Sequence, residues 1–318
     1  MMLVPEVIAI FILNLIFAFF SLVAFVLAVR IFLKWDLNAT TKLQYSLEKQ
    51  SFLTASIIKY IFAIKLPLFL FFIFTLDKIS NLLTGAMCAA GVVDATEYGT
   101  YLFILKIINI YLFGFWLVLH YLDIKSKELK YTKIKFGFFI IIFLLFLTEI
   151  IFEGIMFSTI DIDKMVSCCG TLYSSSATSY ISNIFLIQTP ILLSLFYGNF
   201  LLIVIFYYLR QKEFFSLANL FFIIISIISL ISYFGTYIYE LPTHHCPFCF
   251  LQKDYYYVGY FIYTLLFVGT FNGLTVGFIH DNTRIKKAYK LSLVFNLLFL
   301  LLVSSYPLIY YIKNGVWL

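Results

Sequence analysis

Long apolar runs recur along this chain, and each has the length that a lipid bilayer demands of a helix. A helix needs about 20 predominantly apolar residues to cross the hydrocarbon core, and runs of about 18 or more recur here. Hydrophobic residues make up 63% of the chain and charged residues only 12%, whereas soluble domains carry about 25% charge. The alternating segments of a membrane β-barrel do not occur in the sequence. We therefore expect an all-α, polytopic transmembrane helical bundle.

The apolar runs predict about eight spans within a single integral membrane domain that covers residues 1–318. The spans lie at approximately residues 8–29, 57–76, 101–122, 136–157, 184–209, 217–239, 258–279 and 291–312. The stretches between them are too short to fold by themselves, because chains below about 40 residues bury too little surface. Any function must therefore reside in the helices and in the short loops that join them.

Basic residues are concentrated on alternate loops. Most of the 22 Lys and Arg residues follow the first, third, fifth and seventh spans, and cytoplasmic loops carry such an excess. We predict that both termini lie outside, in the cell membrane (the inner membrane) of a bacterium or archaeon. The same distribution explains the net charge of +6 without a nucleic-acid partner. No basic residue precedes the first span, so we do not expect it to be cleaved as a signal peptide.

All five cysteines fall in loops that are predicted to lie outside, and two of them form a Cys-x-x-Cys pair within His-His-Cys-Pro-Phe-Cys at residues 244–249. Such a pair closes a small disulfide ring when its second cysteine lies on the first turn of a helix. A helix N-terminus or a protonated imidazole stabilises the thiolate. We expect the seventh span to begin near the pair, with His245 beside Cys246. The pattern predicts thiol–disulfide redox chemistry with an extracytoplasmic thiol protein, in which Cys246 attacks and Cys249 resolves.

The same segment suits a soft metal ion. Imidazole and thiolate groups are preferred ligands of Zn(II) and Cu(I), so a metal site would use His244, His245, Cys246 and Cys249. The protein would then be a metal-handling or haem-handling permease or an assembly factor.

The other three cysteines leave the pairing open. Cys168 and Cys169 are adjacent in the chain, which fits a vicinal disulfide, a pairing of one of them with Cys88, or the capture of a soft metal. Cysteines outside the cell also commonly pair for stability alone. A third hypothesis is therefore a structural membrane subunit that contains disulfides.

The segment Cys246-x-x-Cys249-x-x-Gln252-Lys253 resembles the C-x-x-C-x-x-[QE]-R segment of the disulfide bond formation protein B family, the quinone-linked membrane thiol oxidases. In that family the segment lies at the outer end of a transmembrane helix. The resemblance implies that Cys246 exchanges with a partner protein, that Cys249 faces a quinone, and that Gln252 and Lys253 bind this cofactor. The family has four helices, two cysteine pairs and Arg at the position of Lys253.

Several charged residues fall inside the predicted spans. Glu149 and Glu153 are four residues apart and share one helix face, and Lys106 lies at a similar depth in the third span. Because an unpaired charge inside a membrane is expensive, we expect Lys106 to neutralise Glu149 or Glu153. The cluster is interpreted either as a proton or cation relay or as a structural ion pair between helices. Lys65, close to Pro67, is a further buried base.

A short pattern occurs twice. Cys88 precedes Tyr-Gly-Thr-Tyr at residues 98–101, and Cys246 precedes Tyr-Val-Gly-Tyr at residues 257–260. Each pattern lies between the second and third spans of a four-span half, which is consistent with a duplicated half. The sequence contains no P-loop, H-E-x-x-H or G-x-S-x-G motif, so it does not indicate an ATPase, a zincin or a serine hydrolase.

Overall fold

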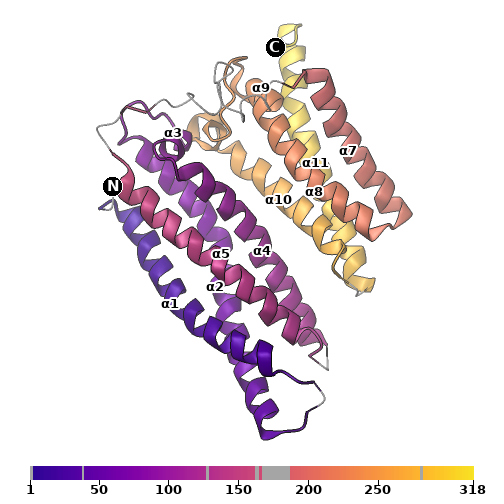
Figure 1. The fold of residues 1–318 in the computed structure, drawn as a ribbon. Helices are drawn as coiled ribbons and strands as arrows, with labels where there is room; N and C mark the ends of the chain where they lie inside the picture. The colour runs from indigo at the N-terminus through magenta and orange to yellow at the C-terminus, as the bar shows by residue number, and fades with distance from the viewer. Residues whose placement is uncertain (1–2, 38, 127–128, 162–164, 167–186, 280–281) are drawn as a thin grey trace. The chain divides into compact units, whose positions relative to one another are not determined.

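The computed structural model describes residues 3–37, 39–126, 129–161, 165–166, 187–279 and 282–318, which are largely helical (Figure 1). Eight helices in this part of the chain are long and apolar enough to cross a membrane. Large apolar side chains remain exposed along them, among them Phe19, Ile141 and Leu201, as expected of a surface that faces lipid. The prediction of an all-α, multi-pass membrane protein with eight spans is confirmed. The side of the membrane on which each terminus lies stays a prediction.

The chain divides into two compact units. Unit 1 comprises Met1–Thr84 and Ala95–Met165, and unit 2 comprises Gly85–Asp94 and Val166–Leu318. Each unit contains four of the spanning helices. The short segment Gly85–Asp94 follows the second span but belongs to unit 2. The expectation of one membrane domain stays a prediction.

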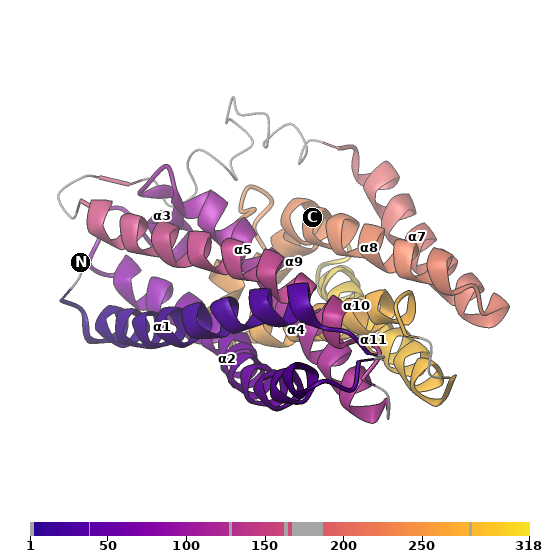
Figure 2. The same cartoon turned by 60° about the horizontal axis from the view of Figure 1, so that its bottom comes forward.

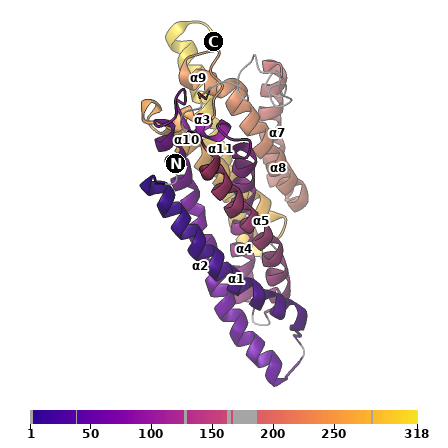
Figure 3. The same ribbon diagram turned by 60° about the vertical axis from the view of Figure 1, so that its left-hand side comes forward.

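Unit 1 is a bundle of four long helices: α1 (Pro5–Lys34), α2 (Lys42–Ser80), α4 (Gly99–Lys125) and α5 (Thr132–Thr159). α1 and α4 each contact both α2 and α5, so the four helices surround one core (Figures 1 and 3). At the start of α2, the Thr41 hydroxyl accepts a hydrogen bond from the Gln44 N–H at 3.3 Å, which caps this helix.

Aromatic side chains fill much of the core of unit 1. Phe62 stacks on Phe113 with ring centroids 4.4 Å apart, and it meets the fully buried Trp116 edge-on at 5.4 Å. At the end of α4, Asp123 accepts a hydrogen bond from the Thr132 hydroxyl at 2.7 Å. This bond ties α4 to the first turn of α5 and fixes the connection between the two helices.

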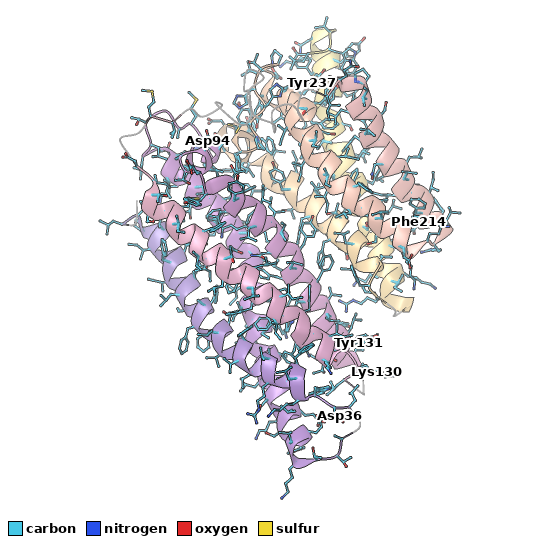
Figure 4. The ribbon with its side chains drawn as sticks, in the orientation of Figure 1. Asp36, Asp94, Lys130, Tyr131, Phe214 and Tyr237 are labelled. Atoms are coloured by element: carbon cyan, nitrogen blue, oxygen red, sulfur yellow. The ribbon has the colours of Figure 1, made fainter. Side chains whose placement is uncertain are left out.

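Unit 2 contains one short helix and a second bundle: α3 (Ala89–Asp94), α7 (Thr189–Leu209), α8 (Lys212–Ser229), α9 (Gly235–Tyr239), α10 (Val258–Val276) and α11 (Asn282–Asn314). The π-helical turn η1 (Leu230–Phe234) joins α8 to α9 and makes Lys212–Tyr239 one span. α8 contacts α7 and α10, and α11 contacts the same two helices (Figure 2). Phe214 near the start of this span and Tyr237 near its end lie at opposite ends of the bundle (Figure 4). The cyclic order of neighbours is the same as in unit 1.

Glycines allow α10 to approach its neighbours closely. A Cβ atom at Gly273 would lie 2.1 Å from the Asn219 side chain of α8, and one at Gly269 would lie 2.1 Å from Asn296 Oδ1 of α11. Asn219 Oδ1 accepts hydrogen bonds from Ser292 Oγ at 3.1 Å and from Asn296 Nδ2 at 2.8 Å. Small residues at the contact and amides bonded across it are the usual means of joining helices in lipid.

Several helices extend beyond the predicted spans. α2 begins at Lys42, whereas the second span was expected from residue 57, because polar first turns continue the helix past the apolar run. α7 begins at Thr189 with Pro190 in its first turn, and residues 184–186 of the fifth predicted span lie outside the described residues. Hydropathy marks the part of a helix that lies in lipid, while backbone hydrogen bonding sets its ends.

Candidate functional site

Three cysteines meet in unit 2. Cys88 directly precedes α3, Cys246 lies in the loop after α9, and Cys249 begins the 3-10 turn η2 (Cys249–Leu251). Their Sγ atoms all lie within 4.8 Å of one another, and Cys88 Sγ is 3.5 Å from Cys246 Sγ. All three are buried thiols, and none is in a disulfide with another described residue. The Cys-x-x-Cys pair therefore gains a third thiol from a segment far away in the chain.

Two tyrosines of the spanning segments hold the loop that carries the pair. The Tyr239 hydroxyl, at the end of α9, donates to the carbonyl oxygen of Cys246 and accepts from the N–H of Phe250 at 3.1 Å. The Tyr263 hydroxyl of α10 donates to the carbonyl oxygen of Pro247 at 2.8 Å. A loop with little regular structure must satisfy its buried backbone groups by side chains, and these bonds fix the positions of both thiols.

Gly259 of α10 makes room for the 3-10 turn. A Cβ atom at this position would lie 2.4 Å from Phe250 Cδ2 and 2.8 Å from Leu251 Cδ2. Any larger residue would push η2 away from α10. Gly259 belongs to the repeated aromatic–glycine pattern, so the sequence carried a signal for this contact.

Gln252 joins the two chain segments of the site. Its Nε2 donates to the carbonyl oxygen of Met87 at 2.9 Å, one residue before Cys88. Lys253 is exposed at the start of the 3-10 turn η3 (Lys253–Tyr255). Gln252 therefore holds the Cys88 segment against the loop, and its predicted contact with a quinone stays a prediction, as does that of Lys253.

The thiols perturb one another strongly. Hydrogen bonds from the thiols of Cys249 and Cys88 hold the pKa of Cys246 well below its usual value. The hydrogen bonds to Cys246 and Cys88 raise the pKa of Cys249 above its usual range. Burial lowers the pKa of His244, so this imidazole is neutral at pH 7. The cluster thus favours one thiolate on Cys246 flanked by thiols, and a low-pKa thiolate is the reactive form of cysteine.

The predicted cause of the low Cys246 pKa, the N-terminus of a spanning helix beside the cysteine pair, is wrong. α10 begins at Val258, so Cys249 does not lie at the N-terminus of a spanning helix. His245 Nδ1 donates a hydrogen bond to the carbonyl oxygen of Ile231 at 3.0 Å. A π-helical turn interrupts the regular bonding of a helix, and His245 satisfies a carbonyl group of η1. The neighbouring thiols replace the helix terminus as the stabilising groups.

The predicted histidine–cysteine metal set differs from the group that the fold assembles. Among the described residues, the side chains placed to share one metal ion are the three cysteines. His244 packs edge-on against the Tyr239 ring, with centroids 4.3 Å apart. Cys168 and Cys169 lie outside the described residues.

The charged side chains inside the predicted spans meet in unit 1. Lys106 Nζ lies 2.9 Å from Glu149 Oε1 and 2.9 Å from Glu153 Oε2. Lys65 Nζ lies 3.2 Å from the same Glu149 oxygen. All four side chains are buried. The ion pairs expected of Lys106 are present, and Lys65 belongs to the same cluster.

Two asparagines that were not predicted from the sequence also belong to this cluster. Asn109 Nδ2 donates to Glu149 Oε2 at 2.6 Å. Asn14 Nδ2 donates to Glu153 Oε2 at 2.9 Å, and its Oδ1 accepts from Lys65 Nζ at 2.8 Å. A single amide in an otherwise apolar span is a recognisable signal, since amides in lipid bond across helices.

Comparison of the chain with protein-family models, with curated proteins and with solved structures finds no match. The function must therefore be inferred from the chemistry of the site. A dithiol that contains a thiolate can exchange with disulfides, and three clustered sulfur atoms can bind a soft metal ion.

Proposed function

We propose that this membrane protein catalyses thiol–disulfide exchange through Cys246 and Cys249, on the outer side of a bacterial or archaeal cell membrane. The proposal rests on the contact of Cys246 Sγ with the Cys88 thiol at 3.5 Å, beside Cys249. Hydrogen bonds from these two thiols lower the pKa of Cys246. A thiolate at neutral pH is the nucleophile in disulfide exchange, and a second cysteine within reach completes the reaction.

In the first step, the Cys246 thiolate attacks a disulfide of an extracytoplasmic partner protein. A bond forms between Cys246 and one partner sulfur, and the other partner sulfur leaves as a thiolate. Cys249 then attacks Cys246, and its proton passes to the departing partner sulfur. The first partner thiolate takes a proton from water, so the partner leaves as a dithiol and the Cys246–Cys249 disulfide forms. The partner gains two electrons and the pair loses two.

A membrane carrier closes the cycle in this proposal. A quinone would accept two electrons and two protons from the Cys246–Cys249 dithiol, which is the direction of the quinone-linked thiol oxidases, and the protein would then oxidise its partner by the reverse of the steps above. A quinol would supply the electrons when the partner is reduced. The resemblance of the segment that ends at Gln252 and Lys253 supports this class of carrier. Because Cys246 is only 1% exposed, a partner protein reaches its sulfur only when the loop moves.

A second candidate function is the handling of Cu(I) or Zn(II). The observation that favours it is the mutual distance of the three Sγ atoms, all within 4.8 Å. Thiolates bind both ions, and three converging sulfurs suit the low coordination of Cu(I). The donor set would then be Cys88, Cys246 and Cys249.

The test of exchange must allow for Cys88. A Cys249→Ser variant still has Cys88 Sγ 3.5 Å from Cys246 Sγ, so Cys88 is expected to resolve the mixed disulfide by forming a Cys88–Cys246 bond. The double variant Cys88→Ala/Cys249→Ser removes both thiols that cluster with Cys246 and should accumulate a covalent complex with the partner, visible on a non-reducing gel. Cys88→Ala alone is the matched control and should accumulate none.

Two outcomes decide between the candidates. If the purified protein titrates as a reversible dithiol in a redox buffer and the double variant traps a partner, exchange is supported. If the protein instead retains one metal ion per chain, and each single cysteine variant loses it without forming a mixed disulfide, the metal function replaces it.

The proposed location has its own test. Reporter fusions placed after Lys130 and after Asp254 should report opposite sides of the membrane. If Cys246 reacts with an impermeant maleimide only from the cytoplasmic side, the proposed orientation is wrong and an extracytoplasmic partner is excluded.

A further inference from the structure

The polar cluster of unit 1 is a closed ring that all four helices supply. Starting at α1, Asn14 bonds to Glu153 of α5, Glu153 to Lys106 of α4, and Lys106 to Glu149 of α5. Glu149 bonds to Lys65 of α2, and Lys65 bonds back to Asn14. Two positive and two negative charges make the ring neutral, which is the state that a low-dielectric interior favours.

One acceptor of the ring is left without a donor among the described residues. Lys65 and Lys106 each give two hydrogen bonds within it, and their ammonium groups also lie over aromatic rings, 4.8 Å from the Phe146 centroid and 4.2 Å from the Phe72 centroid. In contrast, Glu153 Oε1 is buried and has no hydrogen-bond partner within the described part of the chain. A buried carboxylate oxygen without a donor is costly, so this atom marks a place for one more hydrogen.

A small cavity adjoins the ring. It has a volume of about 10 Å³, and its polar lining comes from Asn14, Lys65, Lys106, Glu149 and Glu153. A cavity of about 10–15 Å³ admits a single water molecule when two or more polar groups surround it. The space is therefore too small for a metabolite and large enough for one water, the carrier of a proton.

We propose that unit 1 contains an intramembrane proton site, in which one internal water passes a proton to and from Oε1 of Glu153. The cavity water, as hydronium, gives its proton to the carboxylate and remains as water, and the reverse step restores the ionised ring. This site is independent of the thiol chemistry proposed for unit 2.

Glu153 is better suited to this role than Glu149, its neighbour one turn away. Both oxygens of Glu149 are occupied, by three donors that come from Lys65, Lys106 and Asn109. Glu153 accepts its two bonds, from Lys106 and the neutral Asn14, on Oε2. Protonation at Oε1 of Glu153 breaks none of these bonds.

The charge of the ring makes the loading reversible. A proton on Glu153 leaves one net positive charge among Lys65, Lys106 and Glu149, and an uncompensated charge is unfavourable in a low-dielectric interior. The proton is therefore released again, as a relay requires.

The test is infrared difference spectroscopy of the full-length protein in lipid nanodiscs during acidification. A buried protonated carboxylic acid gives a C=O stretching band at higher frequency than a hydrated one. We expect this band in the wild-type protein, and ¹³C-labelled glutamate should shift it. Glu153→Gln should remove the band, whereas the matched control Glu149→Gln should keep it at more acidic pH, because a proton on Glu153 then leaves the charges of both lysines uncompensated.

Glu153→Asp keeps the charge and covers the case in which Glu153→Gln does not fold. Its band should lose the shift caused by labelled glutamate, because the proton then resides on an aspartate. Three results would overturn the proposal: no such band in the wild-type protein wherever it stays folded, a band that neither Glu153 substitution alters, or equal loss of the band in Glu153→Gln and Glu149→Gln.

Discussion

Removing the ammonium group of Lys106 should destabilise unit 1 strongly. Lys106→Met preserves the length and the apolar stem of the side chain but deletes the group that bridges Glu149 and Glu153, each at 2.9 Å. One positive and two negative charges remain buried. Removing one partner of a buried ion pair costs about 3–5 kcal/mol, and we expect the free energy of unfolding to fall by that amount.

The ring predicts which second substitution rescues this loss. Lys106→Met/Glu153→Gln leaves Lys65 and Glu149, which are in direct contact at 3.2 Å, so the remaining charges pair. Lys106→Met/Glu149→Gln leaves Lys65 and Glu153, which the ring connects through Asn14. The first double variant should therefore recover more stability than the second, with a coupling energy of about 0.5–3 kcal/mol.

Unfolding of unit 1 can be followed by tryptophan fluorescence. Of the three tryptophans, Trp35 and Trp116 lie in unit 1 and Trp317 lies in unit 2. A Trp317→Phe background makes the signal specific for unit 1 during titration of detergent micelles with a denaturing detergent. Strictly additive effects in both double variants, or equal rescue by either glutamine, would refute the arrangement of charges described here.

Three further changes test the packing and the thiol site. Cys249→Ala removes the thiol that most lowers the pKa of Cys246, so that pKa should rise and maleimide labelling of Cys246 should require a higher pH than in the wild-type protein; an unchanged profile would contradict this. Gly273→Ala places a methyl group 2.1 Å from an α8 side chain and should cost about 1–3 kcal/mol in thermal unfolding, whereas Gly198→Ala, with nothing within 4 Å, should cost none. Phe62→Ala empties the centre of the unit 1 core and should cost about 3–5 kcal/mol; a stability loss no larger than that of a lipid-facing Phe→Ala variant would show that the ring stack is unimportant.

The ion pairing of Lys106 was predictable from the sequence because the membrane penalises an unpaired charge wherever it occurs. Lys106, Glu149 and Glu153 lie at a similar depth below the membrane surface in their predicted spans, and the structure contains both ion pairs. The closure of the ring was not predictable. It depends on the rotation of α1 and α2 about their axes, which turns Asn14 and Lys65 inward, and near-uniform hydrophobicity leaves no polar face from which to read that rotation.

The thiol cluster was likewise predictable only in part. The spacing of Cys246 and Cys249 identified a candidate pair, but its local structure was expected to be the start of a helix and is a 3-10 turn. Loops at membrane interfaces lack the periodicity on which such expectations rest. Tyr239 belongs to no motif in the sequence, although its hydroxyl bonds to two backbone groups of the loop.

The class of this protein and the number of its spans follow from the sequence, because the bilayer dictates the length and composition of every helix that crosses it. The residues able to carry chemistry can also be identified there, since charges in lipid and paired cysteines are rare enough to stand out. Which of these residues meet depends on the tertiary fold. Cys88 contacts Cys246, 158 residues further along the chain, because the segment before α3 belongs to unit 2. No local spacing encodes a contact between segments so far apart. Such contacts depend on how the side chains of different helices interlock, and this close packing exists only in the folded protein.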